Sequence, residues 1–105
     1  MDPGEIMQPS TAIDTEYKPQ PIRIVLADDH PIVRDGLRKL LTLEEDIEIV
    51  GEASDGREAV RLANELKPDI VIIDIGMPLL NGLDVVREIR RVSPQTKSLL
   101  LTMHN

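Results

Sequence analysis

The sequence predicts an α/β fold in which helices cover both faces of a parallel β-sheet. The first observation is the stretch Ile70 to Pro78, IVIIDIGMP, where four apolar residues without polar alternation lead into a single carboxylate, Asp74. Such a run is typical of a strand that is buried on both faces of a sheet. The second observation is that runs of strand length alternate with amphipathic stretches of helical spacing, in the order βαβαβαβ. We therefore expect a doubly wound sheet whose strands all end at one edge.

Each expected element is marked by local signals. The expected strands are 22–27, 47–53, 70–73 and 97–103, and the second of these alternates well enough to lie nearer the edge of the sheet. The expected helices are 31 to about 43, about 59 to 66, and 83 to about 92. Pro31 suits a first helical turn, whose N–H would have no helical partner in any case. Pro68 and Pro94 end the second and third helices, because the residue before a proline disfavours helical backbone.

Composition and charge limit the class of protein. The chain has 105 residues, enough for one domain, and a net charge of −7, so it is a poor candidate for binding nucleic acid. It has no cysteine, which excludes disulfides and thiolate zinc sites. It has no apolar run of membrane-spanning length and no signal-peptide pattern, so we expect a cytoplasmic protein. Residues 1–21 are rich in proline and polar residues and are interpreted as a flexible extension, which leaves 22–105 as the domain.

Acidic residues follow two of the expected strands. Asp28 and Asp29 follow the first and Asp74 follows the third, while Thr102 lies at the end of the fourth. Parallel strands present their carboxyl ends at one edge, so these side chains can converge. At ~4 Å in an effective dielectric near 20, each pair of carboxylates would repel by about 4 kcal/mol, and a hard cation such as Mg²⁺ would offset this. A site of this kind supports transfer of a phosphoryl group to a carboxylate, with Asp74 as the acceptor and Asp29 and Asp28 holding the metal.

Each assignment has a simpler alternative. Asp28 and Asp29 could have no role beyond capping a helix, and Asp74 could merely cap a helix or close a turn. Thr102 is a common strand residue. His30 is interpreted as a solvated loop residue, because one histidine alone makes a weak metal site. Two other functions stay open: a small phosphohydrolase with an aspartyl-phosphate intermediate, and a fragment that only binds a partner. The hydrolase would need a second acid two residues after the nucleophile, where Gly76 stands.

The segments VLADDHPIVRDGLRKLL, DIVIIDIGMPLLNGLDVVREIR and LLLTMHN carry a family resemblance. Residues 22–105 resemble the receiver domain of bacterial two-component response regulators, in particular the NarL/FixJ-like (LuxR-type) subfamily. The resemblance implies a flavodoxin-like (CheY-like) fold with strand order 2-1-3-4 for the strands present. It implies a phosphorelay signalling domain rather than an enzyme, in which a sensor histidine kinase phosphorylates Asp74. It further implies Mg²⁺ bound by Asp29, Asp74, the main-chain carbonyl of Gly76 and, through water, Asp28, with Thr102 as the switch hydroxyl.

The resemblance also shows what the sequence lacks relative to the family. The chain ends before the family's fifth strand, which carries a lysine, and Lys97 is expected at the opposite end of the sheet from the acids. By the resemblance, we expect this chain to lack the last βα unit and any DNA-binding part, although the parent protein would regulate transcription. We therefore hypothesise that the strand from Lys97 to Met103 presents an open edge through which the chain forms homo-oligomers.

Overall fold

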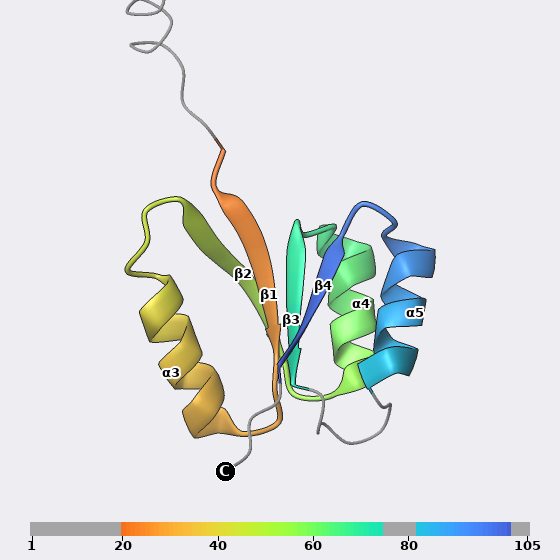
Figure 1. The fold of residues 1–105 in the computed structure, drawn as a ribbon, viewed down its shortest axis with the longest axis horizontal. Helices are drawn as coiled ribbons and strands as arrows, with labels where there is room; N and C mark the ends of the chain where they lie inside the picture. The colour runs from red at the N-terminus through yellow and green to blue at the C-terminus, as the bar shows by residue number, and fades with distance from the viewer. Residues whose placement is uncertain (1–19, 75–81, 102–105) are drawn as a thin grey trace, which may run out of the picture.

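Four parallel strands and three helices make up the part of the chain that the computed structural model describes, residues 20–74 and 82–101. The strands are β1 Ile22–Ala27, β2 Ile47–Ala53, β3 Ile70–Asp74 and β4 Lys97–Leu101. The helices are α3 Pro31–Leu41, α4 Gly56–Leu66 and α5 Gly82–Val92. The strands lie in the order β2-β1-β3-β4, with α3 on one face of the sheet and α4 and α5 on the other (Figure 1). The predicted α/β order and the strand order 2-1-3-4 are confirmed.

Strand β3 lies inside the sheet and is buried on both faces, as the unbroken apolar run predicts. Val71 and Ile73 belong to the larger core cluster, which α4 and α5 cover, whereas Ile72 belongs to the smaller cluster on the side of α3. All three are less than 9% exposed. Successive residues of β3 therefore pack into two different cores. This packing holds the strand from both faces and so fixes the position of Asp74 at its end.

The helix ends differ slightly from the sequence-based prediction, for local reasons. Helix α3 ends at Leu41 rather than near residue 43, because the amides of Leu43 and Glu44 bond carbonyls three residues back and tighten the last turn. Helix α4 begins at Gly56, three residues earlier than expected, because the Asp55 carboxylate caps it by accepting the Glu58 amide at 2.9 Å.

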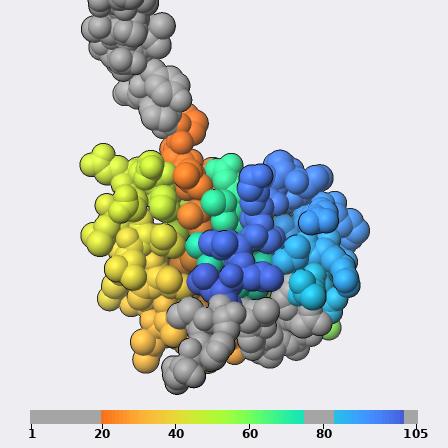
Figure 2. Space-filling view, in the orientation of Figure 1, coloured from red at the N-terminus to blue at the C-terminus, as the bar shows by residue number. Residues whose placement is uncertain are grey.

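Strand β4 forms one edge of the described sheet. It pairs with β3 alone among the strands in residues 20–74 and 82–101, and its side chains reach the molecular surface, dark blue in Figure 2. Leu99 is 50% exposed. Lys97 pairs with Ile70 and Leu101 with Asp74, so Lys97 does lie at the opposite end of the strand from the acid. The last two residues of the expected strand, Thr102 and Met103, lie outside the described residues, as do 1–19 of the expected extension.

Within the described residues, none of the helices has both the length and the apolar character that crossing a bilayer requires.

Candidate metal centre

Strand β1 delivers the first two acids to the carboxyl edge of the sheet. The Asp28 amide continues the ladder with β2 by donating to the Ala53 carbonyl at 3.0 Å. The Asp28 side chain is 3% exposed, and its Oδ1 accepts the main-chain N–H of His30 at 2.7 Å. The carboxylate thus closes the turn that leads into α3. The simpler interpretation of Asp28 as a helix cap is wrong, because His30 is the residue at the cap position of α3 and no side chain caps that helix.

Strand β3 delivers the third acid beside the other two. Ala27 pairs with Ile73 in the parallel ladder, so the residues that follow them, Asp28 and Asp74, leave neighbouring strands at the same level. Asp74 is itself the last residue of β3 and is only 6% exposed. The carboxylates of Asp28, Asp29 and Asp74 and the ring of His30 each contribute one atom to a group in which all four atoms lie within 4.8 Å of one another. The structure therefore brings together the three acids that the sequence singled out.

His30 belongs to this group, which the sequence analysis did not predict. Its Nδ1 lies 3.2 Å from Asp28 Oδ1, 3.0 Å from Asp29 Oδ1 and 3.7 Å from Asp74 Oδ2. The side chain is 62% exposed, so the ring as a whole is solvated, as interpreted from the sequence, while its Nδ1 contacts the acids. A protonated imidazole at this place partly offsets the repulsion among the carboxylates.

The charge around His30 raises the pKa of its imidazole above the usual 6.5, first through the hydrogen bond with Asp28 and then through the charge of Asp29. A raised pKa stabilises the fold below about pH 6.5, and this contribution is lost as pH rises through the folded-state value. We expect NMR titration to give His30 a pKa above 6.5 and to find it lower in Asp28→Asn. His30→Gln assigns the resonance, and an unchanged pKa in Asp28→Asn would contradict the contact.

The donor set of the acidic group suits a hard divalent cation. Asp29 Oδ1 is buried and accepts no hydrogen bond from any described residue, and the cationic group nearest to it is His30 Nδ1 at 3.0 Å, which carries charge only when the ring is protonated. A buried carboxylate oxygen without a hydrogen bond is costly unless a cation or water satisfies it. Oxygen ligands with several coordination positions left for water match the preference of Mg²⁺. The residues present therefore fit this ion, with Asp29 and Asp74 as candidate ligands and Asp28 beside them.

Two residues of the expected site lie outside the described part of the chain. These are Gly76, expected to offer its main-chain carbonyl, and Thr102, the expected switch hydroxyl. Both stay predictions. Strand β3 ends at Asp74, two residues before Gly76, and the described part of β4 ends at Leu101, just before Thr102. Asp74 and Leu101 are partners in the ladder.

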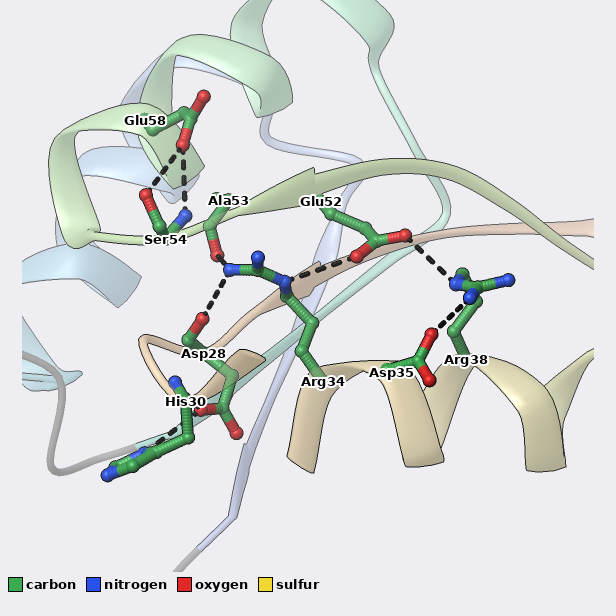
Figure 3. A network of polar contacts seen from close by, with 9 residues as sticks. All are labelled: Asp28, His30, Arg34, Asp35, Arg38, Glu52, Ala53, Ser54 and Glu58. Atoms are coloured by element: carbon green, nitrogen blue, oxygen red, sulfur yellow. Dashed lines mark hydrogen bonds and ion pairs between the residues drawn. The ribbon is translucent and has the colours of Figure 1, made fainter. Parts of the chain in front are cut away.

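A polar network behind the acids was also missed by sequence reasoning. Arg34 of α3 donates from Nη1 to the main-chain oxygen of Asp28 at 2.8 Å and from Nε to Glu52 of β2 at 3.1 Å (Figure 3). Glu52 also pairs with Arg38, whose Nε lies 3.3 Å from Glu52 Oε2. No motif signals such a contact, because Arg34 and Glu52 are 18 residues apart and meet only once β1 and β2 pair.

Comparison with known proteins gives matches over most of the chain. The family model for the response regulator receiver domain matches residues 24–105. An uncharacterized transcriptional regulatory protein, YhcZ of Bacillus subtilis, is 42% identical over 80% of this chain and 39% of its own length. The nitrate/nitrite response regulator NarL of Escherichia coli is 37% identical over 82% of this chain and 40% of its own. The chain thus spans about two fifths of the length of these relatives.

A solved structure has the same fold. The signal receiver domain of the putative response regulator NarL from Mycobacterium tuberculosis superposes with a TM-score of 0.78 at 36% identity, covering 83% of this chain and 70% of that one. The flavodoxin-like architecture expected from the sequence is therefore confirmed. The NarL-type resemblance is confirmed as well, since matches of this type recur among both sequences and structures.

Proposed function

This chain belongs to the response regulator receiver domain family, and on that premise we propose that it accepts a phosphoryl group on Asp74 with Mg²⁺ bound beside it. The observation that supports the proposal best is the meeting of three carboxylates at the end of the central strands, one of them with a buried oxygen that accepts no hydrogen bond from the described residues. The transfer would signal rather than turn over a metabolite, in keeping with the regulatory relatives.

The chemistry needs a nucleophile, a counter-charge and a donor. An Asp74 carboxylate oxygen attacks the phosphorus, and the bond from phosphorus to the donor breaks as the new P–O bond forms. With phosphohistidine as donor, the P–N electron pair stays on the imidazole, which takes up a proton. Bound Mg²⁺ would neutralise the carboxylates and one phosphoryl oxygen. Asp29 and the main-chain carbonyl of Gly76 would hold the ion with Asp74, while Asp28 keeps the turn closed and reaches the ion through water.

The partners proposed are a sensor histidine kinase and, in a longer parent protein, a DNA-binding part, all acting in the cytoplasm. Thr102 would form a hydrogen bond with the phosphoryl group and carry the change to the surface of β4. A shift of such a switch from about 1:99 to 99:1 needs roughly 5.5 kcal/mol of differential interaction. We therefore expect this chain to bind Mg²⁺ more readily than it completes the conformational switch.

Phosphorylation by acetyl phosphate tests the proposal directly. Intact-mass measurement in excess MgCl₂ is expected to show one added phosphoryl group that hydroxylamine removes and that Asp74→Asn does not acquire. Asp84→Asn is the matched control, because it removes an acid on α5 that lies outside the acidic group and should leave the adduct intact. Rapid loss of the adduct with release of phosphate would favour a phosphohydrolase, and no adduct at all would contradict the proposal.

Self-association through β4 is a second expected property. The other edge strand, β2, carries an exposed charge at Glu48, which discourages pairing, whereas β4 has one charge, Lys97, and then Ser98 and three leucines. We expect light scattering to show concentration-dependent association that Leu99→Lys weakens. Leu43→Lys, the same change at a residue that is 76% exposed and outside the strands, should leave it unchanged. A monomer at all concentrations would contradict the expectation.

A further inference from the structure

We infer that Arg34 is the positioning residue of the acidic site, and that its contact with Glu52 holds it in place to fix the Asp28–Asp29 peptide. The inference rests on the proposed function, because the site it serves is the proposed magnesium site. It adds a role for two residues that are not candidate ligands and lie on α3 and β2.

The loop between β1 and α3 is held mainly by contacts of one residue, Asp28. Helix α3 begins after His30 without a side-chain cap, and its first turn contains a proline and no acidic residue. The start of the helix is therefore not fixed by a capping side chain. Apart from the bond that the Arg34 amide donates to the His30 carbonyl, the described main-chain contacts of this loop involve Asp28. Its amide bonds the Ala53 carbonyl, its carboxylate bonds the His30 amide, and its carbonyl accepts the Arg34 guanidinium. Arg34 thus supplies the contact that sets the orientation of the peptide linking Asp28 to Asp29.

The geometry of an arginine side chain suits the position of Arg34. The guanidinium is a planar fork with several N–H groups in fixed directions. In Figure 3 one edge of it faces the main-chain oxygens of Asp28 and Ala53, while Nε faces Glu52. The side chain of Arg34 is 21% exposed and that of Glu52 is 34% exposed, so both are partly shielded from water. The carboxylate on β2 therefore fixes the plane of the guanidinium, and the guanidinium fixes the Asp28 carbonyl.

The contact between Arg34 and the Asp28 carbonyl affects the metal site through the repulsion among its acids. Three carboxylates whose oxygens lie within 4.8 Å repel one another, so the peptide bearing two of them tends to rotate away from Asp74 unless it is held. If the Asp28 carbonyl is released, Asp29 can turn toward solvent and the ligand set is lost. Residues that hold metal ligands in place by hydrogen bonds, without contacting the metal, typically contribute about 10–100-fold to metal affinity.

Charge and position predict opposite results for removal of Arg34, which makes the inference testable. The guanidinium is a cation close to the site, so by charge alone its removal would strengthen Mg²⁺ binding. We expect instead that Arg34→Met weakens it by about 10–100-fold. Arg34→Lys keeps the charge and loses the fork, and should weaken binding by a similar factor. Glu52→Gln keeps an acceptor oxygen and should cost less, at most about fivefold, as for a partly exposed ion pair.

The experiment is a Mg²⁺ titration of each folded variant, with amide solvent exchange of His30 measured by NMR as a readout that needs no metal. Lys39→Met is the matched control, because Lys39 is a cation on the same helix whose described ion pair is with Asp35 and not with Glu52 or Asp28. It should bind Mg²⁺ within about twofold of the unmodified chain, since an exposed ion pair contributes little. Faster exchange of the His30 amide in both Arg34 variants, and not in Lys39→Met, is expected.

The outcomes separate the inference from the proposed function. Unchanged Mg²⁺ affinity and unchanged His30 exchange in Arg34→Lys would overturn the inference, and this variant decides if Arg34→Met does not fold. If the unmodified chain binds no Mg²⁺, the proposed function fails. Exchange at His30 then still decides whether Arg34 positions the loop: faster exchange in Arg34→Lys supports it, and unchanged exchange refutes it.

Discussion

Asp74→Asn is expected to stabilise the chain in the absence of magnesium and to abolish its stabilisation by magnesium. The substitution keeps the shape of the side chain and removes one of three mutually repelling charges from a site in which Asp28 and Asp74 are buried and Asp29 is partly exposed. The gain in the free energy of unfolding should be about 1–2 kcal/mol. This is below the ~4 kcal/mol of repulsion between two close carboxylates in a dielectric of 20, because His30 and water already screen the charges. Urea unfolding in excess EDTA measures it.

The same titration repeated with magnesium gives the larger effect. A ligand that binds only the folded state at about 100 times its Kd adds roughly 2.7 kcal/mol to the free energy of unfolding. The unmodified chain should gain this amount and Asp74→Asn almost none, so that the order of the two stabilities reverses. Glu65→Gln, a change of the same kind on the exposed side of α4, should behave as the unmodified chain does. Equal gains from magnesium in the unmodified chain and in Asp74→Asn would mean that magnesium binds elsewhere.

Ile73→Ala is expected to have the largest effect on folding. Ile73 is fully buried between the sheet and the two helices of the larger core cluster, so its truncation removes apolar contacts and leaves a cavity. Changes of this kind cost about 2–5 kcal/mol, a large part of the 5–15 kcal/mol available to a small domain. Leu99→Ala on the exposed edge strand is the control and should cost about 0.5 kcal/mol or less. Similar losses at both positions in urea unfolding would contradict the burial of β3.

The sequence was sufficient to predict the centre of this fold. The apolar run before Asp74 predicts a strand buried on both faces, and Val71, Ile72 and Ile73 do face two different cores. The acids could be predicted as well, because the carboxyl ends of parallel strands share one edge wherever the exact register falls. Both predictions depend on patterns within a few consecutive residues.

The parts that the sequence could not reveal depend on contacts between distant residues or on side-chain conformation. Arg34 and Glu52 read as ordinary charges on a helix and a strand, and they meet only when β1 and β2 are in register. The position of His30 Nδ1 among the carboxylates depends on one rotamer of a mainly exposed ring. The early end of α3 depends on how its last carbonyls are satisfied, which propensity alone does not determine.

The central claim is that the acids at the ends of β1 and β3 bind one divalent cation, and paramagnetic line broadening by Mn²⁺ tests it most directly. At substoichiometric Mn²⁺ we predict that the amide signals of Asp28, Asp29 and Asp74 broaden first and that excess Mg²⁺ restores them. The exposed acidic run Glu44 to Asp46, which precedes β2, serves as the internal control for unspecific binding. Broadening that begins in this run, or that spares Asp29 and Asp74, would contradict the account.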